Sequence, residues 1–66
     1  MEEARRTALN LLRNRTLTPD DLYIAFYAVG GTAGPLELEA YIYGLLPVSV
    51  TDAELLFHAL QKLQEI

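Results

Sequence analysis

The sequence predicts an all-α fold, a compact bundle of four short helices with a central αα-hairpin. Three observations predict it. Apolar residues recur at intervals of three and four along four segments, as they do on one face of a helix. Capping residues and prolines precede several of these segments, and glycines follow two of them. The extended apolar stretch from Leu45 to Val50 has no second strand with which to form a sheet.

The composition predicts a single domain that associates with another chain. A core built from only 66 residues rarely stabilises a domain by more than a few kcal/mol. The chain has no cysteine, so neither a disulfide nor a thiolate metal site can strengthen it. Yet 52% of its residues are hydrophobic, which leaves apolar surface exposed on so small a domain. We therefore expect a homo-oligomer, such as a homodimer, or a complex with a protein partner.

Residues 1–16 form the basic part of the domain, with a helix expected from Met1 to about Asn14. Their net charge is +2 and that of residues 17–66, a capped three-helix core, is −6, which together give −4. Three arginines lie off the apolar stripe and a fourth follows the end of the helix. All four are candidate anion contacts: Arg5, Arg6, Arg13 and Arg15. The simpler interpretation is a solvated amphipathic helix.

The second helix has clear start signals. Thr18 is a good N-cap, Pro19 suits the first helical position, and Asp21 completes a capping box. The helix is expected to run to about Val29 and to be central, because it is apolar on nearly all sides.

A glycine turn joins this helix to the third, which is expected from Pro35 to about Tyr43. Gly30 and Gly31 can take the positive φ that ends a helix, and Gly44 is expected to end the next one.

The fourth helix is expected to run to about Glu65. Thr51 to Glu54 matches a capping box at its start. The apolar connection before it, Leu45 to Val50, is expected to pack across a helix end. The four apolar stripes give these core residues: Ala4, Ala8, Leu11 and Leu12; Leu22, Ala25, Phe26 and Val29; Leu38, Tyr41, Ile42 and Leu45; Leu56, Ala59, Leu60, Leu63 and Ile66.

The inventory of reactive groups does not favour an enzyme. Ser49 and His58 are the chain's single serine and single histidine, and they lie on different elements. No metal-ligand spacing and no phosphate-binding loop occurs. We expect no catalytic residue, no cofactor, no metal and no small-molecule substrate.

The tyrosines are the candidate partner-binding residues, because a tyrosine ring suits an interface that is dry on one side and wet on the other: Tyr23, Tyr27, Tyr41 and Tyr43. The alternative is that they pack at the edge of the core. The expected function is that of a non-enzymatic, self-associating interaction module.

A small DNA-binding regulator of the helix-turn-helix type is the alternative function, since two helices and a short glycine turn could frame such a motif. The expected third helix carries Glu37 and Glu39 and no basic residue, so nucleic acid is not the expected partner. The charge asymmetry suits head-to-tail self-association or a positively charged protein partner.

Three stretches carry a family resemblance: T-P-D-D-L-Y-I-A-F-Y, G-G-T-A-G-P-L-E-L-E-A-Y-I-Y-G-L-L-P and A-E-L-L-F-H-A-L. Together they resemble a group of short, uncharacterised all-helical actinobacterial proteins, over roughly Leu17 to Leu63. The resemblance implies the fold but no catalytic residue or cofactor. No signal peptide or membrane span is evident, so a cytoplasmic protein is expected.

Overall fold

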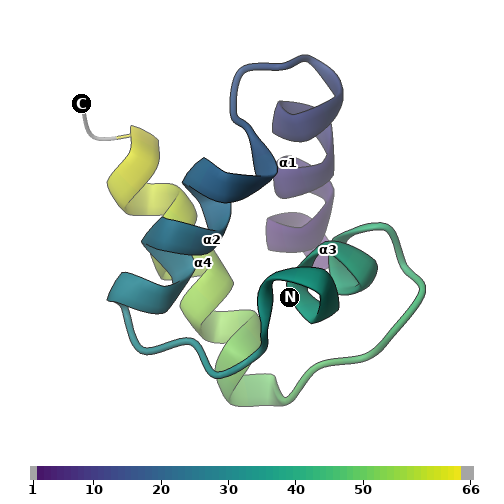
Figure 1. The fold of residues 1–66 in the computed structure, drawn as a ribbon, viewed down its shortest axis with the longest axis vertical. Coiled ribbons are helices and arrows are strands. Elements are labelled where there is room, and N and C mark those ends of the chain that lie inside the picture. The colour runs from purple at the N-terminus through teal and green to yellow at the C-terminus, as the bar shows by residue number, and fades with distance from the viewer. Residues whose placement is uncertain (1, 65–66) are drawn as a thin grey trace.

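Four helices make up most of the molecule. A computed structural model describes residues 2–64 and contains α1 (Glu2–Arg13), α2 (Pro19–Ala28), α3 (Pro35–Ile42) and α4 (Val50–Gln64) (Figure 1). The predicted all-α class is confirmed, and the predicted helix ends differ by about one residue where they fall within the described part. Met1, Glu65 and Ile66 lie outside the described residues.

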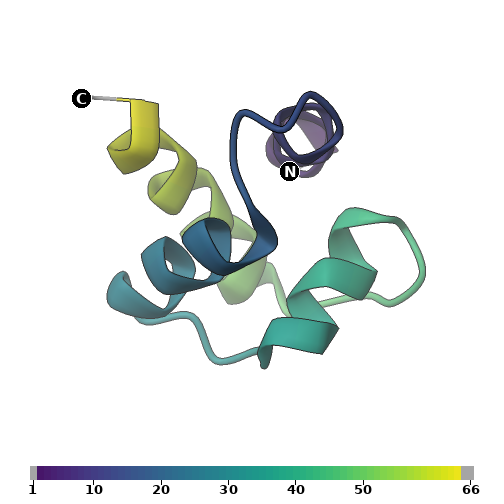
Figure 2. The same cartoon turned by 45° about the horizontal axis from the view of Figure 1, so that its top comes forward.

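Each helix packs against at least two of the others. α1 and α2 each contact both α3 and α4, so the predicted α2–α3 hairpin is present. In Figure 1, α2 crosses α4 on the left, α1 lies at the upper right and α3 at the lower right, and Figure 2 shows the same arrangement from another side. The radius of gyration is 10.2 Å, close to the ~11 Å of a compact chain of this length.

The core combines large side chains from α2, α3 and α4 with small ones from α1. The largest fully buried side chains are these: Leu22, Phe26, Ile42 and Leu56. α1 contributes Ala4 and Ala8, whose small size lets its backbone approach the other helices closely. The other predicted core residues in the described part are buried or half-buried, except Leu45. That prediction was wrong, because the chain turns at Gly44 and leaves Leu45 76% exposed.

The predicted starts of α2 and α3 are confirmed. Thr18 Oγ1 accepts the backbone N–H of Asp21 at 3.1 Å, and an Asp21 carboxylate oxygen accepts the N–H of Thr18 at 3.4 Å. At α3, Glu37 Oε1 accepts the N–H of Gly34 at 3.0 Å, and Pro35 takes the first helical position. Local sequence therefore fixes both starts.

The start of α4 corrects a prediction. Ser49, not Thr51, is the cap: Ser49 Oγ accepts the backbone N–H of Asp52 at 3.0 Å. The helix accordingly begins at Val50, and Thr51 lies within its first turn. The connection before it does not pack as expected, because Leu45, Leu46 and Val50 are exposed.

α1, α2 and α3 end in the same type of turn, a Schellman motif. At the end of α1, for example, the Thr16 N–H donates to Leu11 O at 3.0 Å and the Arg15 N–H to Leu12 O at 3.2 Å. The residues with left-handed backbone at these ends are Arg15 (φ +58°), Gly30 (φ +97°) and Gly44 (φ +79°). Gly30 and Gly44 thus behave as predicted.

Gly31 does not take a positive φ, so that part of the prediction was wrong. It is needed for space, because a Cβ at Gly31 would overlap the ring of Phe26. Phe26 is fully buried and its ring has no room to move aside. The chain can pass over this ring only where it carries no side chain.

Candidate protein-interaction surface

Many large apolar side chains remain outside the core. The exposed ones are these: Ile24, Tyr27, Leu36, Tyr43, Leu45, Leu46, Val50 and Phe57. Most of them lie between residues 36 and 50, in α3, in the connection that follows it and at the first residue of α4. Isolated apolar residues are normal on a protein surface, but this concentration in one segment marks a candidate interface.

α3 is apolar on both its inner and its outer side. Leu38 and Ile42 face the core, whereas Leu36, Ala40 and Tyr43 recur at helical spacing on the opposite side. Leu36 is 81% exposed and Tyr43 45% exposed. We call Leu36, Ala40 and Tyr43 the outer surface of α3. A helix that is apolar on two opposite sides normally packs on both of them, so this surface is typical of a contact with another chain.

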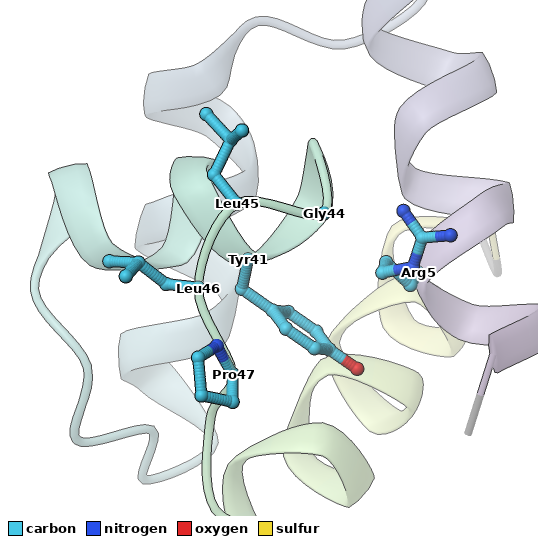
Figure 3. A pocket seen from close by; sticks show the side chains of 6 residues that line it. All are labelled: Arg5, Tyr41, Gly44, Leu45, Leu46 and Pro47. Carbon is cyan, nitrogen blue, oxygen red and sulfur yellow. The ribbon is translucent and has the colours of Figure 1, made fainter.

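The connection between α3 and α4 extends the apolar segment and borders a pocket. The pocket has a volume of about 370 Å³ and is lined by Arg5, Tyr41, Gly44, Leu45, Leu46 and Pro47 (Figure 3). The figure shows the Tyr41 ring extending between Pro47 and the Arg5 side chain. Gly44 is favoured there by its φ of +79°, since a Cβ would make only an ordinary contact, 3.5 Å from Arg5 Nη1.

Arg5 joins α1 to the end of α3. Its Nη1 donates a 2.9 Å hydrogen bond to the backbone carbonyl of Ile42, in the last turn of α3. The final carbonyls of a helix have no partner within the helix, and the helix dipole favours positive charge there. The contact therefore holds α1 against α3 and fixes the place where the connection leaves the helix. The sequence suggests Arg5 as an anion contact and does not reveal this carbonyl partner.

The structure does not bring the four candidate tyrosines onto one surface. Tyr23 and Tyr27 are neighbours on α2, with ring centroids 6.1 Å apart, and Tyr27 is the more exposed. Tyr41 is half-buried in the pocket, whereas Tyr43 belongs to the outer surface of α3. Residues two apart on a helix point in nearly opposite directions, so Tyr41 and Tyr43 cannot share one flat contact.

The candidate arginines are likewise separated. Arg5 is half-buried against Ile42, whereas Arg6, Arg13 and Arg15 are exposed. Arg6 and Arg13 are seven residues apart and so lie on one side of α1. Arg15 follows the helix in a left-handed turn.

Asp52 fixes the loop between α2 and α3. Its carboxylate is buried and accepts both the backbone N–H of Thr32, at 3.0 Å, and the Thr32 hydroxyl, at 2.8 Å. A buried carboxylate requires such donors, because burial without them is costly. This contact places Gly31 over Phe26 and orients the start of α3. No local sequence pattern predicts this contact, because it joins residues 20 positions apart.

The single serine and the single histidine are not placed for a joint reaction. Ser49 Oγ caps α4, and His58 is exposed with its ring edge against Phe57 at a centroid distance of 5.7 Å. Within residues 2–64, no three His, Cys, Asp or Glu side chains are grouped so that they could hold a metal ion. Nor does any helix in this part have both the length and the apolar character to cross a bilayer.

Comparison with known proteins gives no relative. No protein-family model matches the chain, and no characterised protein or solved structure is significantly similar to it. The resemblance to short actinobacterial proteins stays a prediction. The properties of the described surface are therefore the basis on which a function can be argued.

Proposed function

We propose that the protein is a non-enzymatic interaction module that self-associates through the outer surface of α3 and the leucines that follow it. The observation that carries this proposal is the exposure of Leu36, Tyr43, Leu45 and Leu46 in one short segment. Burying one leucine side chain contributes about 1.5–3 kcal/mol, so a few such residues can drive association of a small domain. A domain of this size gains stability from association that its own core cannot supply.

The anchoring of α3 also supports an interface there. Arg5 holds its end through Ile42, and Asp52 holds the loop that leads into its start through Thr32. The surface is thus presented on a helix fixed at both ends, and a preformed surface binds with a smaller loss of conformational entropy. A rigid surface of this kind favours a specific contact over non-specific association.

A duplex-binding function is not favoured by the same residues. A recognition helix would need basic side chains that reach phosphates, whereas the exposed part of α3 is apolar and carries Glu37. Arg5, one of the four candidate anion contacts, is bound to a backbone carbonyl. The remaining exposed arginines lie on or next to α1.

Sedimentation velocity across a dilution series tests the proposal. We expect the wild type to form a dimer or a larger species that dissociates on dilution. Leu36→Gln removes apolar surface without adding charge, and we expect it to raise the dissociation constant roughly tenfold or more.

Ile24→Gln is the matched control, because Ile24 is 65% exposed on α2 and lies outside the proposed surface. We expect it to leave the dissociation constant unchanged. If it alone weakened association, the contact would lie on α2. A wild type that stayed monomeric at every concentration would exclude self-association altogether.

A further inference from the structure

The outer side of α1 combines positive charge with a partly exposed apolar residue. Arg6 and Arg13 are exposed on one side of the helix, and Leu9 lies half-buried between them, where it also packs against the edge of the core. Seven residues of helix span about 10 Å, so the two arginines sit about 10 Å apart along the axis. We call Arg6, Leu9 and Arg13 the outer surface of α1.

The outer surface of α3 is apolar and flanked by acidic residues, so it complements the basic outer surface of α1, and the two surfaces have the same length. Leu36 and Tyr43 are also seven residues apart, which again corresponds to about 10 Å. Glu37 and Glu39 flank this apolar stripe, Glu37 exposed and Glu39 half-buried. A basic stripe and an acid-flanked apolar stripe of equal length therefore occur on neighbouring helices of one molecule.

We propose that the outer surface of α1 in one copy docks on the outer surface of α3 in a second copy, and that the contact is reciprocal. α1 and α3 pack against each other and are joined through Arg5 and Ile42, so the two helices that carry these surfaces are neighbours (Figures 1 and 2). A reciprocal contact has two-fold symmetry and closes at a dimer, whereas a one-way contact would continue into a filament. This inference rests on the self-association proposed above and specifies which surfaces meet.

The charged residues in such a contact mainly determine which two surfaces pair, and contribute little to the affinity. Exposed ion pairs stabilise weakly, but like charges brought together at an interface oppose association. The arginines would thus guide α1 onto the acidic side of α3 and prevent α1 from pairing with α1. Apolar contacts of Leu36 and Tyr43 would supply most of the affinity.

Charge exchange between two variants tests the pairing by sedimentation velocity. Leu36→Lys places a positive charge opposite the arginines of the second copy and leaves the Glu37 cap intact. The double variant Arg6→Glu/Arg13→Glu places negative charge opposite Glu37 and Glu39. We expect each variant alone to dissociate roughly tenfold or more readily than the wild type. Leu36→Glu, the matched control for Leu36→Lys, should associate more tightly than Leu36→Lys.

Mixing the two variants gives the decisive result. In the mixed dimer, α3 of the Leu36→Lys copy would face α1 of the Arg6→Glu/Arg13→Glu copy, so opposite charges would meet there. The second contact would join the unsubstituted α1 and α3 surfaces. We therefore expect a dimer that contains one copy of each variant. If both variants weaken association but the mixture does not restore it, the pairing is wrong. If Arg6→Glu/Arg13→Glu associates like the wild type, the pairing is wrong while self-association stands.

A wild type that remains monomeric would overturn both proposals, and the outer surface of α3 would then be available to a basic segment of another protein. Circular dichroism checks that each variant is helical. If the double charge reversal unfolds the protein, Arg6→Gln/Arg13→Gln replaces it: weaker association supports the pairing, and unchanged association overturns it.

Discussion

Arg15 adopts a backbone conformation in which a side chain is unfavourable. Its φ is +58°, at the position of the Schellman turn that glycine occupies after α2 and α3. For an L-residue other than glycine this conformation costs about 1–2 kcal/mol, because Cβ approaches the following carbonyl. The end of α1 is therefore held by its hydrogen bonds and by packing of α1, against a local backbone preference.

We expect Arg15→Gly to stabilise the protein. The substitution relieves the left-handed strain and adds flexibility to the unfolded chain, which offsets part of the gain. The net effect should be an increase of about 0.5–1 kcal/mol in the free energy of unfolding. Urea denaturation at a fixed protein concentration measures it. Arg15→Ala removes the same charge but keeps the strain, so an equal gain in that control would attribute the effect to charge.

The helix starts and ends show where the local sequence is sufficient to predict the boundary of a helix and where it is not. Thr18, Asp21 and Gly30 act through neighbours a few residues away, and the sequence predicts their roles correctly. At α4, however, two overlapping segments match a capping pattern, one from Ser49 to Asp52 and one from Thr51 to Glu54. The structure uses Ser49, and Asp52 lies where it accepts both hydrogen bonds from the α2–α3 loop. That contact is tertiary, so no local pattern could select between the two starts.

Substitution at the two possible caps distinguishes them. We expect Ser49→Ala to lower the free energy of unfolding by about 1 kcal/mol, since it leaves the Asp52 N–H without its acceptor. Thr51→Ala should have little effect or stabilise slightly, because Thr51 is exposed inside the helix and alanine has the higher helix propensity. Thermal and urea unfolding measure both. A larger loss for Thr51→Ala than for Ser49→Ala would place the start of α4 two residues later.

At the scale of the whole molecule, the sequence predicts an excess of apolar residues but not where that excess is exposed. Periodicity in α3 correctly identifies Leu38 and Ile42 as core residues, yet Leu36 is equally apolar and faces outward. Which of the two apolar sides of this helix is buried depends on the helices packed against it, here α1 and α2. The same limit applies to the tyrosines and to Arg5: their residue types suggest contacts, whereas the partners depend on the fold.

Association should also be visible as a concentration-dependent Tm. If the folded protein self-associates and the unfolded chain does not, mass action stabilises the folded state more as concentration rises. We expect the wild-type Tm to increase over about a hundredfold range of protein concentration, and the Tm of Leu36→Gln to increase less over the same range. Ile24→Gln should keep the wild-type slope even if its Tm differs, because it changes a surface outside the proposed contact. Equal slopes for the wild type and Leu36→Gln would show that Leu36 does not contribute to the association. A wild-type Tm that is independent of concentration would mean that the four helices are stable as a monomer and that the outer surface of α3 does not bind a second copy.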